Sequence, residues 1–305
     1  MPEGPEVLLL RDYLYYKIKN TILKDIIYIS GKYKKKDIEY ADELIDCKFK
    51  DILTKGKFMY FILEAPDKTL KYMMITFGLT GEWSFKKGNN SRVKFVIKRR
   101  DKNYNLYFND DMNYGTLKAT IIFSDINKKL NNLEDDLITS EYDYYTLKQR
   151  INNYIKKYPK NGNLKIIEFL MNQDKGKSIG SGLGNYLSVE ILYDSGISPH
   201  KLIKDLLDKD DVIKKLTESI MKILKLACYR NNLGYMKDFS DYIPKRNQMI
   251  LECKYPEYLK NVKIDDNKKF IFSVYKQINS PNNNPIIIDS IIKDRKTYWC
   301  KQEQS

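Results

Sequence analysis

Apolar residues recur at helical spacing near the start of the chain and at strand spacing through most of its first half. Four apolar positions fall three or four residues apart: Val7, Leu10, Leu14 and Ile18. This spacing predicts an amphipathic helix over residues 5–20. Short aliphatic and aromatic runs follow, divided by polar turns, and predict strands over residues 22–29, 58–63, 72–77, 93–97, 104–108 and 119–123. We therefore expect a helix followed by a β-sandwich or barrel.

The second half of the chain has a different pattern. Residues 131–163 are polar, and we expect a linker between two domains there. Helical periodicity then returns over residues 164–172, 187–194 and 211–230. A C-terminal β-hairpin is predicted from about residue 270, with strands over 270–278, 286–292 and 297–300. The chain is thus expected to have an α+β fold with two domains, over residues 1–130 and 164–305.

The charge balance indicates a polyanionic partner. The 305 residues include 54 Lys and Arg against 40 Asp and Glu, which gives a net charge of +14. A basic surface attracts nucleic acid and gains free energy when counterions are released. The 25 tyrosines supply flat rings on which unpaired bases can stack. A single basic run, such as residues 32–36, is equally typical of a solvated loop, so the overall excess carries the interpretation.

Several classes of protein lack the residues that they would need. The cysteines form no C-x-x-C pair, and there is one histidine: Cys47, Cys228, Cys253, Cys300 and His200. This set does not resemble a zinc site, a disulfide framework or a Ser-His-Asp triad, so we expect reduced, structural thiols. Charges interrupt the first 20 residues where a signal peptide needs apolar ones, and no apolar run is long enough to span a membrane. We expect a soluble, intracellular protein.

The first residues carry a candidate nucleophile. Removal of the initiator Met, usual when a small residue follows, would expose the secondary amine of Pro2. An α-amino group has a reference pKa of about 8, so a substantial fraction is uncharged near neutral pH and can attack an aldehyde-like carbon. Glu3 and Glu6 lie beside it in sequence and are candidates to move protons. The same residues also suit an ordinary helix start with a proline in its first turn.

Six short motifs along the chain occur in an order that is typical of one family. The first seven residues read MPEGPEV, and later segments read TKGKFMYF at 54–61, TFGLTGEW at 76–83, FNDDMNYG at 108–115, GLGNYLSVEILY within 172–200, and DRKTYWCKQEQ at 294–304. Together they resemble the Fpg/Nei family of DNA glycosylases and AP lyases, with the segment at 108–115 similar only in outline. Because the matches keep their order from residue 1 to residue 304, they carry more weight together than any one alone.

The resemblance implies roles for individual residues. Pro2 would be the Schiff-base nucleophile at C1′ of the damaged nucleotide, and Glu3 the acid that opens the sugar. Lys57, counted with the catalytic residues, would hold phosphates around the extruded nucleotide with Asn185 and Arg295. Two further carboxylates are supporting candidates that equally suit a helix surface: Glu6, and Glu190, which would hold the glycine loop or face the base. The implied fold adds a helix-two-turn-helix and a β-hairpin finger, over about 270–305.

The finger departs from the family pattern. The usual finger binds zinc through two C-x-x-C pairs, whereas Cys300 is the one cysteine here, Glu303 takes the partner position, and the turn at 279–285 has none. This resembles the zincless finger of one Nei-like branch, so we expect no metal and a hairpin held by packing. Three aromatic residues are candidates for that packing: Tyr275, Tyr298 and Trp299.

The loop expected to fill the gap left by the flipped nucleotide also departs. Many relatives have arginine where this chain has Met112 and Asn113, followed by Tyr114, and Leu79 corresponds to a family wedge position. Methionine can wedge and asparagine can bond only weakly, so recognition of the opposite base is in doubt. Activity on single-stranded or open DNA is favoured because extruding a base there needs little unstacking.

The resulting hypothesis is a bifunctional DNA glycosylase and AP lyase of base excision repair. It would remove oxidised pyrimidines and hydantoins, then cut the strand by β,δ-elimination, without a cofactor. Its partner would be damaged DNA, single-stranded or duplex, with no membrane, and we expect a monomer acting wherever the DNA is, in nucleus, cytoplasm or viral compartment. Two alternatives stay open: a catalytically inactive nucleic-acid-binding protein on the same scaffold, and an RNA-directed binder.

Overall fold

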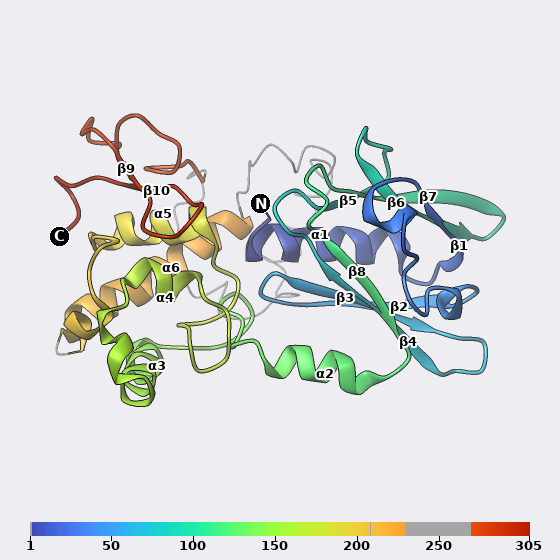
Figure 1. Ribbon diagram of the computed structural model, residues 1–305, viewed down its shortest axis with the longest axis horizontal. Coiled ribbons are helices and arrows are strands. Elements are labelled where there is room, and N and C mark those ends of the chain that lie inside the picture. Colours follow the sequence, from blue (N-terminus) through green and yellow to red (C-terminus); the bar gives the residue numbers. More distant parts are fainter. Residues whose placement is uncertain (1, 208, 230–269) are drawn as a thin grey trace. The chain divides into compact units, whose positions relative to one another are not determined.

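The computed structural model describes residues 2–207, 209–229 and 270–305 (Figure 1). The chain divides into two compact units, Met1–Asn131 and Asn132–Ser305. The first combines helices with an antiparallel sheet and the second is mainly helical, so the expected α+β class is confirmed. Residues 131–163, expected as a linker, lie almost wholly in the second unit and include helix α3 (Tyr144–Lys157).

Helix α1 (Gly4–Ile18) begins the first unit, close to the bounds that its periodicity predicts. Glu3 caps its N-terminus and Pro5 lies in its first turn, where the missing N–H needs no partner. The consecutive residues Leu8, Leu9 and Leu10 are all buried, so the helix is covered on more than one face. It packs against the strands β2 and β3 described below.

Eight strands form one antiparallel sheet in the first unit. Their bounds are β1 (Ile22–Tyr28), β2 (Lys48–Lys55), β3 (Phe58–Glu64), β4 (Leu70–Thr76), β5 (Glu82–Ser84), β6 (Ser91–Arg99), β7 (Lys102–Asn109) and β8 (Thr116–Thr120). The order across the sheet is β5-β7-β6-β1-β2-β3-β4-β8, and every neighbouring pair is antiparallel. The expected runs at 22–29, 58–63, 72–77, 93–97 and 104–108 all fall on strands of this sheet.

The sheet curls until its two halves face each other. Four strands separate β3 from β5, so at about 4.8 Å per strand a flat sheet would hold them about 24 Å apart. The rings of Phe61 on β3 and Trp83 on β5 are instead 5.5 Å apart. Trp83 also contacts Phe95 at 5.0 Å and Phe108 at 5.2 Å, and all four side chains are buried. This aromatic core explains the sandwich-like arrangement that the alternating runs predict.

The boundary after β8 differs from the prediction. A strand over 119–123 is wrong at its C-terminal end, because β8 ends at Thr120 and helix α2 (Phe123–Asn131) begins three residues later. The hydroxyl of Thr120 donates to the carboxylate of Asp125 at 2.8 Å and accepts the N–H of Ile122, which turns the chain into the helix. Strands β2 and β5 were not predicted, since their polar residues obscure the alternation.

Four helices carry the core of the second unit: α3, α4 (Ile166–Met171), α5 (Asn185–Ser195) and α6 (Asp210–Tyr229). Helix α5 packs against α4, α6 and the C-terminal hairpin, and its apolar residues from Leu187 to Leu192 are buried. The prediction for 211–230 agrees with α6, with Arg230 and Cys253 outside the described residues. Among the helices described, none combines the length and apolar character needed to cross a membrane.

The C-terminal hairpin is smaller than predicted. Strands β9 (Ile287–Asp289) and β10 (Thr297–Trp299) pair antiparallel, within the expected runs. The expected strand over 270–278 is wrong, because only an isolated bridge between Asn279 and Pro285 closes the turn. Its backbone N–H groups bond elsewhere: those of Ser273, Val274 and Tyr275 donate to a carboxylate on helix α5.

Candidate functional site

The start of helix α1 places two carboxylates directly after Pro2. Glu3 and Glu6 are each 1% exposed, whereas Pro2 is half-buried. They form a reciprocal capping box, in which the Glu3 side chain accepts the N–H of Glu6 and the Glu6 side chain accepts the N–H of Glu3 at 2.9 Å. The box satisfies two N–H groups that a helix start leaves without intrahelical partners. Two buried carboxylates are therefore fixed in position beside the candidate amine.

Lys57 lies in the two-residue turn between β2 and β3. Lys55 and Phe58 form the last pair of that hairpin, and Gly56 has a φ of +57°, a conformation that glycine adopts without strain. The half-buried Lys57 side chain thus starts from a tight, well-defined turn. Helix α1 packs on these same two strands, so the turn and the capping box belong to one packed element group.

A hydrogen-bond staple joins the two loops that carry the wedge candidates. The hydroxyl of Thr80 donates to the Asp110 carboxylate at 2.5 Å and accepts the N–H of Met112 at 2.9 Å. The other Asp110 oxygen accepts the N–H of Gly115 at 2.7 Å. Leu79, next to Thr80, is half-buried, and the Met112 side chain is 49% exposed. The staple brings the backbone at Leu79 and Met112 together, an arrangement that their spacing in sequence does not predict.

Arg92 fixes the same loop from the sheet. Its guanidinium donates to the carbonyl oxygens of Asp110 at 2.7 Å and Asp111 at 3.0 Å, and to the hydroxyl of Ser30 at 3.1 Å. Asn113 follows with a φ of +58°, and Tyr114 is 61% exposed. The sequence analysis missed Thr80, Arg92 and Asp110. The threonine and aspartate within the motifs at 76–83 and 108–115 were the signal that could have found the staple.

In the second unit, Asn185 meets the hairpin that carries Arg295. Asn185 is the first residue of α5, and its Nδ2 donates to the carbonyl oxygen of Lys296 at 3.0 Å. Its Oδ1 is buried and has no hydrogen-bond partner among the residues described. Arg295 is half-buried and lies in the connection between β9 and β10. The side chain of Asn185 and the backbone beside Arg295 are therefore held together.

The glycine-rich turn before α5 is already hydrogen-bonded within the chain at two positions. The N–H of Ser181 donates to the carbonyl oxygen of Asp135 at 2.8 Å, and that of Gly182 donates to the side chain of Gln173 at 3.2 Å. The sequence analysis expected the amides of this turn to meet an anion, and at these two residues they do not. The positive end of the α5 dipole and the Asn185 side chain remain for that purpose.

Glu190 holds a distant segment against helix α5. Its carboxylate is 1% exposed and accepts the N–H groups of Ser273 at 2.8 Å, Val274 at 3.0 Å and Tyr275 at 2.8 Å. Burial raises the pKa of Glu190, and the three amide bonds act in the opposite direction. Of the two roles considered from the sequence, these contacts are with neither the glycine loop nor a base. Glu190 positions residues 273–275.

The hairpin is packed by aromatic rings and by the single histidine. The rings of Tyr275 and Tyr298 are 5.3 Å apart. Asp289 accepts the indole N–H of Trp299 at 2.7 Å and lies 2.6 Å from Nε2 of His200, whose ring meets that of Trp299. His200 is therefore taken up by the hairpin. Cys47, Cys228 and Cys300 are free and buried.

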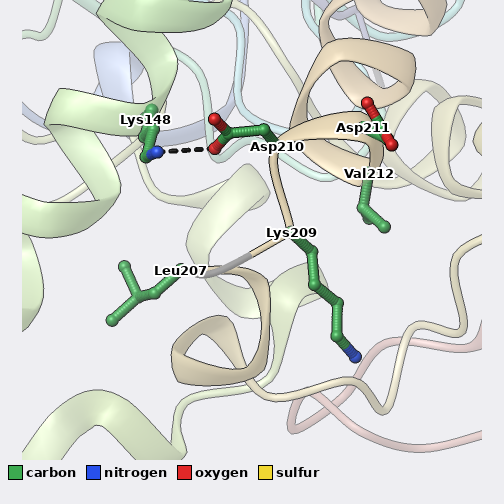
Figure 2. Close-up of a pocket in the computed structure, with 6 residues that line it drawn as sticks. All are labelled: Lys148, Leu207, Lys209, Asp210, Asp211 and Val212. Carbon is green, nitrogen blue, oxygen red and sulfur yellow. Dashed lines mark hydrogen bonds and ion pairs between the residues drawn. The ribbon is translucent and has the colours of Figure 1, made fainter.

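One pocket lies away from all of these residues, at the start of helix α6. Figure 2 shows Lys148 of α3 reaching Asp210, with the Nζ and Oδ1 atoms 2.5 Å apart. The pocket is lined by Lys148, Leu207, Lys209, Asp210, Asp211 and Val212. None of these six is a predicted site residue, and the ion pair already neutralises the carboxylate at its edge.

Comparisons with known proteins agree with the fold and the motifs. Residues 1–117 match the family model described as the formamidopyrimidine-DNA glycosylase N-terminal domain, and residues 260–304 match the C-terminal domain model. The formamidopyrimidine-DNA glycosylase of Wolbachia pipientis subsp. Culex pipiens (strain wPip) is 28% identical over 209 residues, which cover 68% of this chain and 71% of that protein.

Solved structures share the fold over almost the whole chain. The MutM (Fpg) protein of Thermus thermophilus has a TM-score of 0.72 at 16% identity, covering 99% of this chain and 98% of that chain. Lactococcus lactis formamidopyrimidine-DNA glycosylase, non-covalently bound to DNA with an AP site, has a TM-score of 0.71 at 16% identity and 99% coverage of both chains. With both family domains matched and the fold shared, the chain belongs to the Fpg/Nei family of DNA glycosylases, enzymes of base excision repair.

Proposed function

We propose that this protein is a bifunctional DNA glycosylase and AP lyase that uses the N-terminal amine of Pro2. The observation that carries the proposal is the pair of buried carboxylates, Glu3 and Glu6, locked in a reciprocal capping box directly after that proline. An ordinary helix start needs no second buried acid, whereas amine-based lyase chemistry needs a proton donor fixed near the nucleophile.

The reaction begins once the initiator Met has been removed. The Pro2 nitrogen forms a bond to C1′ as the bond from C1′ to the damaged base breaks, and the base leaves with a proton. Glu3 donates a proton to the ring oxygen O4′, which opens the sugar and gives an iminium. The iminium acidifies C2′, whose proton is lost as the C3′–O3′ bond breaks in β-elimination. The C5′–O5′ bond breaks in the δ step, and water releases Pro2.

Three side chains supply the phosphate contacts. Lys57 acts as a point charge from the β2–β3 turn, Arg295 as a planar fork, and Asn185 as a hydrogen-bonding group at the positive end of α5. The net charge of +14 draws DNA to the protein without regard to sequence. DNA is thus bound mainly through its backbone, and the protein acts as a monomer without a cofactor.

Oxidised pyrimidines, hydantoins and abasic sites are the proposed substrates, with single-stranded or open DNA favoured. Support comes from the stapled loops, where Leu79 and the exposed Met112 can wedge into a base stack but carry no guanidinium for the orphaned base. Cleavage rates on oligonucleotides with an oxidised pyrimidine, a hydantoin, 8-oxoguanine or an abasic site test this order. Faster cleavage of 8-oxoguanine than of all the others would contradict it.

Borohydride trapping tests the lyase proposal. Verified Met-processed protein is mixed with single-stranded and duplex oligonucleotides that contain an abasic site, beside Glu3→Gln and a form with a residue added before Pro2. We expect a covalent complex with wild type and none when Pro2 is blocked. Tight DNA binding without any trapped complex would instead support the catalytically inactive binder, and preference for RNA over lesion DNA in competition would support the RNA-directed binder.

A further inference from the structure

The C-terminal finger contains a carboxylate where a zinc-binding relative has a thiolate. Glu303 follows Cys300 at the spacing of a C-x-x-C pair, and the facing turn offers Ser280, Asn282 and Asn284. Structural zinc is held by thiolate sulfur and imidazole nitrogen, so one thiol, one carboxylate and neutral amides do not fit it. Over the described parts of the chain, no three His, Cys, Asp or Glu side chains are grouped to hold a metal ion.

The Glu303 carboxylate accepts four hydrogen bonds instead. One oxygen accepts the hydroxyl of Ser280 and the Nδ2 of Asn284, the latter at 2.8 Å. The other accepts the hydroxyl of Tyr193 at 2.6 Å and the Nδ2 of Asn282 at 2.7 Å. An ionised carboxylate has about four acceptor sites, so these donors use its full capacity. The thiol of Cys300 lies 3.4 Å from the same group.

The four donors come from separate parts of the second unit. Tyr193 lies on helix α5, the other three lie in the turn at 280–284, and Glu303 itself follows strand β10. One side chain thus connects the helix, the turn and the hairpin. Bonds to an ionised acceptor are stronger than bonds between neutral groups, and four of them converge on one point as metal ligands do.

We propose that Glu303 takes the structural place of a metal ion and positions the hairpin that carries Arg295 against helix α5. The other end of that helix already contacts the hairpin, through Asn185 and the carbonyl oxygen of Lys296. With both ends tied, Arg295 and Asn185 are held on one rigid element. The consequence for DNA rests on the proposed function, whereas the tie itself does not, and Glu303 is a positioning residue.

Hydrogen–deuterium exchange of the intact protein tests the tie. Glu303→Gln places an amide that must donate as well as accept among four donors, so it leaves some of them without a partner. We expect exchange across residues 287–300 to accelerate about tenfold or more, while the β2–β3 hairpin at 48–64 keeps its rate. Glu141→Gln is the matched control, since Glu141 is exposed in the same unit and the change alters net charge equally.

The same variants separate the tie from the proposed function. Tyr193→Phe removes one donor and should accelerate exchange in wild type but add little to Glu303→Gln. Unchanged exchange in Glu303→Gln, or acceleration of wild type to the variant's rate by a zinc chelator, would overturn the tie. Faster exchange with an unchanged dissociation constant for abasic DNA would keep the tie and instead contradict the phosphate role of Arg295.

Discussion

The N–H of Glu3 donates to the carboxylate of Glu6 at 2.9 Å, and both side chains are 1% exposed. This bond gives the two acids different tasks. Glu6 is engaged with the backbone of its neighbour, whereas Glu3 lies next in the chain to the Pro2 amine. The structure therefore predicts that the two carboxylates are not interchangeable in catalysis.

Substituting the two acids separately tests that difference. We expect Glu3→Gln to lower the single-turnover lyase rate by about 100-fold or more, because it removes a general acid. Glu6→Gln should lower it less, about tenfold, because an amide oxygen can still accept the N–H of Glu3. Both variants should bind abasic DNA as wild type does. Equal losses from the two changes would contradict the division of roles.

The staple between Thr80 and Asp110 should matter most on duplex DNA. Thr80→Val keeps the shape of the side chain but removes a donor to Asp110 and an acceptor for Met112. Leaving such groups unpaired costs about 1–3 kcal/mol, which loosens the loops that carry Leu79 and Met112. We expect duplex cleavage to fall more than single-strand cleavage.

Thr69→Val is the matched control for that change. Thr69 donates to Asp67 at 2.6 Å in the exposed turn between β3 and β4, so the substitution removes the same kind of bond away from the wedge loops. Its ratio of duplex to single-strand cleavage should equal that of wild type. A Thr80→Val ratio equal to wild type would refute the role of the staple.

Lys57 and Arg295 should each account for about one phosphate contact. The logarithm of the DNA binding constant falls linearly with the logarithm of salt concentration, with a slope that loses about 0.7–0.9 per contact removed. We expect Lys57→Gln and Arg295→Gln each to flatten the slope by about this amount. Lys209→Gln, an exposed lysine beside the pocket in Figure 2, provides the comparison and should leave the slope unchanged. Titrations at several salt concentrations measure it.

The tie at Glu303 should weaken only in acid. Hydrogen bonds from Ser280 and Tyr193 lower the pKa of Glu303 to about 2, whereas an unfolded glutamate titrates near 4.3. A lowered pKa stabilises the folded state above the unfolded value, and the contribution disappears as pH falls through the folded value. The difference in melting temperature between wild type and Glu303→Gln should therefore be constant above about pH 5 and shrink from about pH 4.3 toward pH 2.

The neighbours of Glu303 do not titrate in that window. Burial raises the pKa of Tyr193 to about 12 and also raises that of the Cys300 thiol, so both stay neutral in acid. Glu141→Gln again serves as the control and should show no such convergence. A difference that persists unchanged at pH 2 would mean that the charge of Glu303 does not hold the hairpin.

Periodicity predicted the elements whose burial repeats regularly along the chain. Helix α1 and most strands of the curled sheet fall where apolar spacing predicts them. The failures have long-range causes. The expected strand at 270–278 is replaced by amides bonded to Glu190, more than 80 residues earlier, and no local pattern contains that carboxylate. The end of β8 depended on a single side-chain bond from Thr120 to Asp125.

The candidate site followed the same division. The N-terminal motif indicated Pro2, Glu3 and Glu6 because their chemistry is adjacent in sequence. The staple of Thr80 to Asp110 joins loops 30 residues apart, so spacing alone did not predict it. Glu303 was noticed only as a missing cysteine, because its four donors come together through folding.

The most direct test of the account is to map the covalent bond in the borohydride-trapped complex. Mass spectrometry of the digested complex locates the reduced sugar adduct on one peptide. We predict that the adduct lies on the N-terminal nitrogen of Pro2 in Met-processed protein. An adduct on Lys57, or on any other lysine, would contradict the central claim that the N-terminal amine is the nucleophile.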